Sequence, residues 1–346
     1  MSADSTTHPA KRLPWQVATA LIAGALLLLS FPVYQYFRER NHEDNDRRLL
    51  SCIQTSDVNC VETCLDSGAN PRALTFIYQG GSGDRRNTYQ EFPLYEAAGT
   101  GNVAIMQKLI EHGADPRDSM VNAYHRRPLL FVLRGDNAPA IRLLLEHGAD
   151  ANIREESQST PLMQYTSDTN CKTDGLQALL EHGADINAVN SNADSALHYA
   201  ASALSYETVR FLLTHGAKVN SKNKNGSTPL QKACNTFGQT ESLPEHVPSD
   251  WKPLPVAKRE SDRKSAAQIV QLLLENGADP KLANIHGNTA LYNAVECNNA
   301  LTIDLLLSHQ VDVNARNDKG ETPLSIAQKH GFKKSVKKLL QAGAKK

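Results

Sequence analysis

The chain has 346 residues, and its 37 lysines and arginines balance its 37 aspartates and glutamates, so the formal net charge at pH 7 is zero. Proteins that bind nucleic acid usually carry a basic excess or a basic face, so this balance argues against nucleic acid as a partner. The length would allow two globular domains, but a phrase that recurs along the chain indicates a different organisation.

The start of the chain differs from the rest. Residues 1–14 form an N-terminal tail, and residues 15–37 contain no charged side chain. As a helix rising 1.5 Å per residue, this stretch would reach about 34 Å, enough to cross a hydrocarbon core of about 30 Å. Trp15 and Tyr34 near its two ends suit the membrane interfaces. We predict a single transmembrane anchor over residues 15–37 and a linker over 38–45, against the alternatives of a cleaved signal peptide or a buried helix.

Basic residues on the two sides of this segment give opposing indications of its orientation. Arg38 and Arg40 follow it together with further arginines, and such a count favours placing the rest of the chain in the cytoplasm. Lys11 and Arg12 instead form the short basic head that usually begins an exported chain. Of the two, we expect export of the rest of the chain.

A recurring phrase organises everything after the linker. Leu-Leu-Glu-His-Gly-Ala-Asp occurs as Leu144–Asp150 and again as Leu179–Asp185, and variants recur at intervals near 33 residues. Each has the features of a helix end, because its leucines face a core and the glycine takes φ > 0 without steric cost. Starts such as Thr160-Pro161-Leu162 follow, where threonine caps free N–H groups and proline suits the first helical position. This period predicts an all-α solenoid of about eight stacked helix pairs over residues 46–346.

Two segments interrupt the regular period. A connection over residues 71–92 contains Gly80-Gly81-Ser82-Gly83, which we interpret as a β-hairpin tip, because the lysine of a phosphate-binding loop does not follow. An inserted loop over about residues 235–261 holds four prolines, which exclude a regular helix, and a single Trp251. It is either a tolerated loop or one that binds a partner through Trp251.

Three cysteines fall in the first repeat: Cys60 and Cys64 lie four apart on one helix, and Cys52 lies on the helix before it. They could all be small core residues, which is the usual fate of a buried free cysteine. The alternative is a disulfide from Cys52 to Cys60 or to Cys64 in an oxidising compartment. A zinc site is not expected, because no further cysteine or histidine pair completes four ligands.

Catalytic chemistry is not indicated by any motif in the sequence. Metalloprotease, serine hydrolase, Walker A and dinucleotide-binding patterns are all missing, so we expect neither an enzyme nor a cofactor or small-molecule substrate. A column of histidines precedes the repeated glycines, and its structural position favours a role at helix ends over a pH switch. These histidines are His112, His147, His182, His215 and His309.

The repeat resembles the ankyrin repeat, which joins a turn and two antiparallel helices under a Thr-Pro-Leu-His-x-Ala signature. Ser195–Ala201 and Thr322–Ala327 match it best, and only His198 supplies the histidine. Ankyrin arrays bind proteins through the tips of their extended turns, called fingers, and the inner face of each first helix. The resemblance therefore implies a partner-binding surface made of Glu96, Phe131, Arg154, Glu156, Gln164, Asn192, Asp194, Tyr199, Lys222, Lys224, Lys232, Asn293 and Arg316, with Trp251 on the insertion.

Among these, Phe131 and Tyr199 are the expected energetic anchors, because aromatic side chains dominate binding hot spots. Anchored ankyrin proteins of this kind are similar to bacterial ones. We therefore predict a membrane-tethered, non-catalytic binder of one protein partner, in the form of an immunity protein that neutralises a toxic effector enzyme in the bacterial envelope. It would be a single-pass protein of the bacterial inner membrane with periplasmic repeats. The alternative is a cytoplasmic-facing scaffold that recruits or supports a partner enzyme.

Overall fold

A computed structural model describes residues 44–72, 75–78, 88–117, 127–155, 157–167, 171–235 and 256–345. The predicted tail, the predicted anchor over 15–37 and most of the linker lie outside the described residues, as do the tip of the long finger, Glu156 and Trp251.

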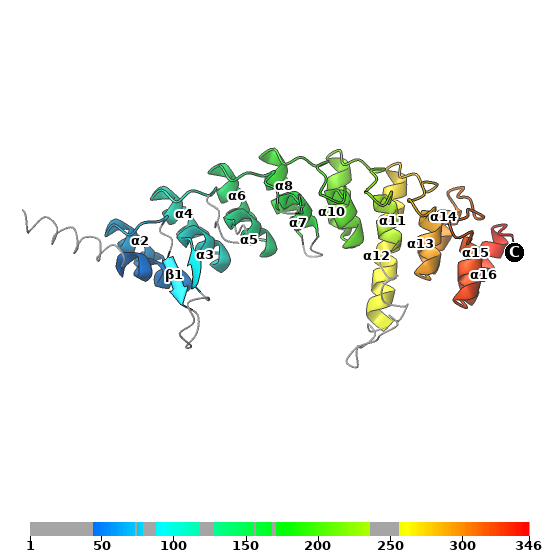
Figure 1. The fold of residues 1–346 in the computed structure, drawn as a ribbon, viewed down its shortest axis with the longest axis horizontal. Helices are drawn as coiled ribbons and strands as arrows, with labels where there is room; N and C mark the ends of the chain where they lie inside the picture. The colour runs from blue at the N-terminus through cyan, green and yellow to red at the C-terminus, as the bar shows by residue number, and fades with distance from the viewer. Residues whose placement is uncertain are drawn as a thin grey trace, which may run out of the picture.

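The described residues form eight helix pairs, stacked one after another into a gently curved array (Figure 1). The first helix of each pair packs against the first helix of the next, as the sequence predicts for an ankyrin-type solenoid. In chain order the pairs are residues 44–54 with α2 (Val58–Asp66), α3 (Pro93–Thr100) with α4 (Val103–Glu111), α5 (Pro128–Arg134) with α6 (Ala138–Glu146), α7 (Pro161–Thr166) with α8 (Thr173–Glu181), α9 (Ala196–Ser202) with α10 (Tyr206–Thr214), α11 (Pro229–Cys234) with α12 (Val256–Glu275), α13 (Ala290–Glu296) with α14 (Ala300–Leu307), and α15 (Pro323–Lys329) with α16 (Lys333–Gln341).

Capping residues mark where these helices begin and end. The hydroxyl of Thr160 accepts a hydrogen bond from the N–H of Met163, and the hydroxyl of Thr228 accepts one from Gln231. Proline follows each threonine at the first helical position, where no N–H partner is needed. Gly148, just after α6, has φ of 93°, a conformation that costs residues with a Cβ energy. The helix boundaries read from the repeated phrases therefore have a physical basis in capping.

The histidine column also belongs to the helix ends. The Nδ1 atom of each histidine lies 2.8–2.9 Å from the carbonyl oxygen four residues earlier, so the ring N–H donates to a carbonyl in the last turn of the helix. In four of the five cases the same carbonyl also accepts the backbone N–H of that histidine. This geometry agrees with the helix-end role expected from the sequence. The five are His112, His147, His182, His215 and His309.

The core runs continuously through the stack. Outer helices contribute leucine and isoleucine side chains that are fully buried, such as Leu144, Leu179 and Leu212. Inner helices contribute alanines, such as Ala200 and Ala233, whose small side chains let neighbouring pairs approach closely. Because each pair leaves an apolar side for the next one to cover, a single pair would expose this core to water.

An asparagine in the finger ties one repeat to the next. Asn187 donates from Nδ2 to the carbonyl of Gly216 at 3.2 Å, and its Oδ1 accepts from the N–H of Lys218 at 2.9 Å. We call this two-bond contact the asparagine clamp. Asn152, Asn220 and Asn314 make the same pair of bonds to the repeat that follows them.

The fingers are also joined through their backbones. Ser191 donates its N–H to the carbonyl of Ser157 at 2.9 Å, and Lys224 donates to the carbonyl of Asn192 at 2.9 Å. The same bond links Ile285 to Asn225 at 3.0 Å, and Asp318 to His286 at 3.0 Å. The fingers from Ser157 to Asp318 therefore form one hydrogen-bonded row, which fixes their spacing along this part of the array.

The two irregular segments differ in structure. Within the long finger, strands β1 (Thr75–Tyr78) and β2 (Thr88–Glu91) pair antiparallel, with Thr75 opposite Glu91. Within the expected insertion, α12 already begins at Val256, directly after the last proline, so the helix takes up the end of the range assigned to a loop. At 20 residues α12 is longer than its neighbours and extends beyond them (Figure 1).

The predicted location in the membrane must be corrected. In the part of the chain that the structure describes, no helix is both long enough and apolar enough to cross a bilayer. A single-pass protein of the bacterial inner membrane with periplasmic repeats is therefore not supported, and neither is a transmembrane helix as part of the fold. The prediction rested on the length of the uncharged stretch over residues 15–37 and on the aromatic residues near its ends, which would suit a membrane helix but do not show that one forms.

Candidate functional site: the concave face

The candidate site is the face lined by the first helix of each pair and the bases of the fingers, which we call the concave face. In Figure 1, α3, α5 and α7 lie on the inner side of the curve, and α4, α6 and α8 lie on the outer side. The sequence predicts that the fourth residue of each inner helix lies on this face. That position holds Glu96, Phe131, Gln164, Tyr199, Lys232 and Asn293.

The two aromatic anchors are held by neighbouring side chains. The ring of Phe131 meets the ring of Tyr95 edge to face, with centroids 5.0 Å apart. The hydroxyl of Tyr199 accepts a hydrogen bond from Nδ2 of Asn190 at 2.8 Å. Both anchors are half-buried. Each side chain is therefore partly exposed while a contact with its neighbour restricts its position.

Charged residues on this face partly neutralise each other. The Oδ1 atom of Asp194 lies 3.5 Å from Nζ of Lys232 and accepts a hydrogen bond from Nδ2 of Asn223 at 2.8 Å. The side chain of Asp194 is 14% exposed and that of Lys232 is 32% exposed. Asp194 therefore mainly positions Lys232, which is the member of the pair that a partner can reach.

A polar cavity of about 270 Å³ lies between α11, α13 and the fingers above them. Its wall includes Lys232 and Asn293 from the predicted set, although Asn293 is buried and donates to the carbonyl of Gln231 at 3.3 Å. The sequence reasoning missed the other amides in the wall, because each looked like an ordinary turn or helix residue. They are Asn225, Gln231, Asn235, Asn284 and Asn288. His286, on a finger where the ankyrin resemblance also expects partner contacts, and Glu296 line the cavity as well. Several of these amides are already paired within the protein: both polar atoms of Gln231 are engaged, and Oδ1 of Asn284 accepts from the N–H groups of His286 and Asn288.

Some of the predicted finger residues have structural contacts instead of free side chains. Arg154 donates from Nη1 to the carbonyls of Gln158 at 3.0 Å and Val189 at 2.9 Å, and Arg316 donates to the carbonyl of Gly320 at 2.8 Å. Nζ of Lys222 lies 3.4 Å from the carbonyl oxygen of Ala283. These side chains brace the fingers. Asn192 and Lys224 are exposed at the tips, and Glu96 and Gln164 are half-buried on inner helices.

Titratable groups near this face are paired in ways that favour structure over catalysis. Burial, and then a hydrogen bond to Glu321, raise the pKa of Tyr292, whose hydroxyl donates to Oε2 of Glu321 at 3.1 Å. A hydrogen bond from Asn317 lowers the pKa of Glu321. The hydrogen bond from the neutral phenol of Tyr292 to the ionised carboxylate of Glu321 therefore joins two repeats. Neither group has the pKa near neutrality that a general acid or base requires.

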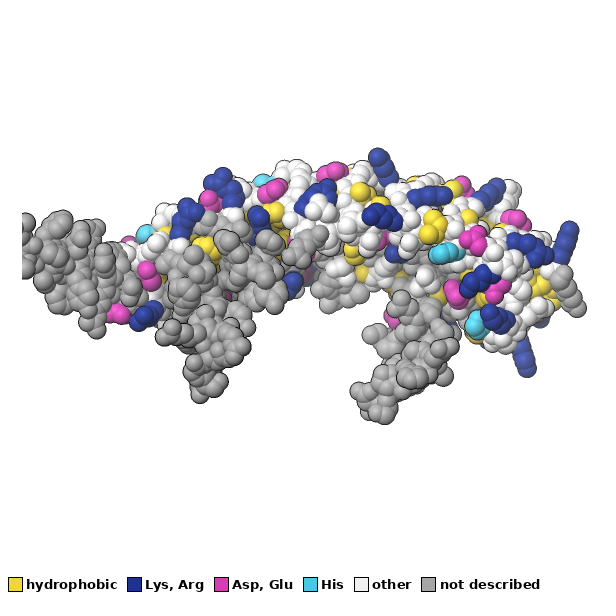
Figure 2. Space-filling model, viewed as in Figure 1, with side chains coloured by type: hydrophobic (Ala, Val, Ile, Leu, Met, Phe, Trp, Pro, Cys, Tyr) yellow, Lys and Arg dark blue, Asp and Glu magenta, His cyan; other side chains and the backbone are white. Residues whose placement is uncertain are grey.

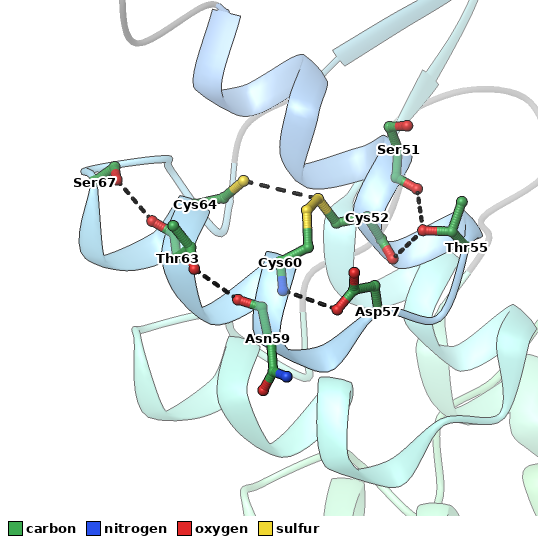
Figure 3. Close-up of a disulfide and its surroundings, with 9 residues drawn as sticks. All are labelled: Ser51, Cys52, Thr55, Asp57, Asn59, Cys60, Thr63, Cys64 and Ser67. Atoms are coloured by element: carbon green, nitrogen blue, oxygen red, sulfur yellow. Dashed lines mark hydrogen bonds between the residues drawn. A yellow bond between two sulfur atoms is a disulfide. The ribbon is translucent and has the colours of Figure 1, made fainter.

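The cysteine cluster lies at the other end of the array, in the terminal pair (Figure 3). Cys52 and Cys60 form a disulfide, and Sγ of Cys64 lies 3.9 Å from Sγ of Cys52. Within the described ranges, these three side chains are the group whose spacing could hold a metal ion. Because the disulfide uses two of the sulfurs and burial raises the pKa of the Cys64 thiol, this oxidised cluster offers no set of thiolate ligands.

Comparison with known proteins gives a single family. The model of ankyrin repeats in three copies matches residues 49–155, 94–190, 162–244 and 261–346. The E3 ubiquitin-protein ligase KEG of Arabidopsis thaliana is 36% identical over 87 residues, which are 25% of this chain and 5% of the ligase. A fowlpox virus protein named for ankyrin repeats is 39% identical over 84 residues, which are 24% of each chain. Protein PhlB of Serratia liquefaciens is 42% identical over 76 residues, which are 22% of this chain and 34% of PhlB.

This chain thus spans at most about a third of the length of these relatives, and the similarity lies in the repeats. The family match covers most of the chain and coincides with the stacked helix pairs of the structure. The chain belongs to the ankyrin repeat family.

Proposed function

We propose that this ankyrin array is an immunity-type inhibitor that holds one protein, a toxic effector enzyme, on its concave face. Ankyrin repeats are a protein-binding module, and the inhibitor role is our specific proposal for this chain. The observation that carries it is the fixed concave face, where half-buried Phe131 and Tyr199 are held by Tyr95 and Asn190.

Rigidity is what an inhibitor of this kind needs. The asparagine clamps hold the repeats from α5 to α12, which carry both Phe131 and Tyr199, in register before any partner arrives. A surface that is already ordered loses little entropy on binding, which favours a tight and stoichiometric complex. Lys232 beside the polar cavity adds a charge that steers the partner and sets the register of the complex.

The test is a pull-down with the full-length chain carrying Phe131→Ala and Tyr199→Ala together, followed by identification of the captured protein. We expect the double substitution to weaken capture by about 2 kcal/mol or more, since hot-spot aromatics carry such energies. Tyr206→Ala is the matched control, because Tyr206 is a 39% exposed tyrosine at the start of α10, the second helix of its pair, and is not among the residues of the concave face. Equal capture by the double variant and the control would remove the concave-face assignment.

A scaffold that supports its partner would bind through the same face. The enzymatic activity of the bound partner distinguishes such a scaffold from an inhibitor. For an inhibitor, adding one equivalent of the chain abolishes the enzymatic activity of the captured protein. For a scaffold, the activity is unchanged or rises. Retained activity in the stoichiometric complex would therefore contradict the inhibitor proposal without affecting the binding site.

A further inference from the structure

A second surface lies away from the concave face, where the helix pairs of the last three repeats turn. A cavity of about 750 Å³ opens there between the N-terminal half of α12, the start of α14 and the turn between α15 and α16. We call it the C-terminal groove. We propose that it binds an acidic segment of a partner protein that also carries an apolar side chain.

The groove exists because α12 is longer than the other second helices. Its N-terminal half rises past the turns of the following repeats and forms one wall, with Arg263 and Lys264 on it. Hydrogen bonds fix the floor against both walls. Nδ2 of Asn299 donates to the carbonyl of Arg263 at 3.1 Å, and the hydroxyl of Ser335 donates to Oδ1 of Asn298 at 3.0 Å. The groove is therefore preformed, which reduces the cost of binding.

The floor of the groove is apolar. Leu301, in the first turn of α14, is 50% exposed and is among the most exposed large apolar side chains in the described chain. Phe332 is half-buried in the opposite wall, and its ring stacks on that of His330 with centroids 5.4 Å apart. Because an exposed leucine beside an aromatic ring favours contact with apolar groups, the floor suits an apolar side chain of the partner.

The rim of the groove is basic. Arg263, Lys264, Lys333 and Lys334 line it against the single carboxylate of Glu260. The whole chain has no net charge, so this cluster is a local feature. No ion pair joins Lys264, Lys333 or Lys334 to a carboxylate in the described part of the chain. Lys333 and Lys334 also stand in the first turn of α16, where the helix dipole disfavours cations. An anion bound beside them would neutralise the clustered positive charges and offset this unfavourable interaction with the dipole.

Carboxylates around a central apolar side chain match this arrangement. An acidic peptide segment offers both in one short stretch and can lie along the groove between its walls. A nucleic acid would satisfy the lysines, but it would leave Leu301 against charged phosphate. The chemistry of floor and rim together therefore selects the acidic, partly apolar peptide.

The experiment uses the full chain and a short fluorescent peptide of alternating glutamate and leucine, with binding followed by fluorescence anisotropy. We expect saturable binding that weakens with added salt. Lys333→Glu combined with Lys334→Glu should raise the dissociation constant about tenfold or more, because the charges then repel. Leu301→Ser should also weaken binding, and a peptide with serine in place of leucine should bind less tightly to the unaltered chain.

Lys337→Glu is the matched control, since Lys337 is exposed on the same helix but does not line the groove. Circular dichroism verifies that each variant is folded. The proposal is overturned if the peptide does not bind, if Lys337→Glu weakens binding as much as the double reversal, or if an oligonucleotide of equal charge binds more tightly. The Phe131 and Tyr199 double variant should still bind the peptide, so failure here is separable from failure of the concave-face proposal.

Discussion

His198 and Gln231 occupy the same helical position in consecutive repeats and make the same two contacts. Nδ1 of His198 accepts from the N–H of Ser195 at 3.1 Å, and Nε2 lies 3.0 Å from the carbonyl of Ser227, to which it donates. Oε1 of Gln231 accepts from the N–H of Thr228 at 2.9 Å, and Nε2 donates to the carbonyl of Asn288 at 2.8 Å. The slot therefore requires one acceptor and one donor at this spacing, and a neutral imidazole or an amide supplies both.

This equivalence predicts a pH dependence that one substitution removes. Burial lowers the pKa of His198 below its ordinary value of 6.5, against the opposing effects of the Ser227 carbonyl and of Asp194, with Lys232 also nearby. Because the unfolded chain then takes up the proton first, the stability due to neutral His198 is present above about pH 6.5 and is lost as the pH falls below it.

His198→Gln should therefore unfold near the wild-type urea midpoint at pH 7.5 and lose less stability on acidification to pH 5. Urea unfolding at the two pH values measures this. An equal loss in both proteins would show that His198 does not carry the acid sensitivity.

Hydrogen bonds within one repeat could be predicted from the sequence, and those between repeats could not. Asp185 forms a turn within its own repeat, because its carboxylate accepts from the N–H of Asn187 at 2.9 Å. The clamp that Asn187 makes to the next repeat was missed, since a contact across repeats leaves no mark within one of them. Asn293 was placed on the accessible surface, but it is buried because its amide reaches the carbonyl of Gln231. The position of Asn293 in its helix could be predicted from the sequence, but the hydrogen bond that its side chain makes to a neighbouring helix could not.

At the scale of elements, helices with local signals at both ends were predictable. The threonine of each Thr-Pro-Leu sequence caps the start of a helix and the repeated glycine ends one, and the observed helix bounds agree with these signals. The start of α12 had no such signal, since prolines fix where a helix cannot be but not where the next one begins. Its buried Ile269, Val270 and Leu273 lie in its second half, so the projecting half, which forms the groove, has little apolar pattern.

The terminal helix pair depends on its disulfide. Cys52 and Cys60 are eight residues apart and join the two helices of a pair that has a neighbour on one side within the described array. A crosslink over so short a loop contributes about 2.5 kcal/mol by restricting the unfolded chain. Reduction should therefore speed hydrogen exchange in α2, with α16 as an internal reference at the other end of the array. Cys52→Ala combined with Cys60→Ala should remove the effect of the reductant, and unchanged protection of α2 on reduction of the unaltered chain would refute the role of the crosslink.

At the scale of the whole molecule, stability depends on the contacts between repeats. Asn187→Ala removes both bonds of a central clamp and should lower the free energy of unfolding by about 1–2 kcal/mol, the usual net value of two hydrogen bonds. Asn192→Ala is the matched control, because its contact with the next finger runs through its backbone carbonyl. Urea unfolding compares the two. A similar midpoint for both variants would mean that the clamp adds nothing to the coupling between repeats.

The clamps are unevenly distributed along the chain. Arg72, Arg117 and Lys281, each following a proline, stand where other fingers carry the asparagine. The clamps therefore join the helix pairs from α5 to α12 into one continuous block, and the junctions directly before and directly after this block lack the clamp. When a partner binds the concave face, we expect the clamped helix pairs to keep a fixed spacing. The helix pairs on either side of them should then move relative to this block to match the shape of the partner.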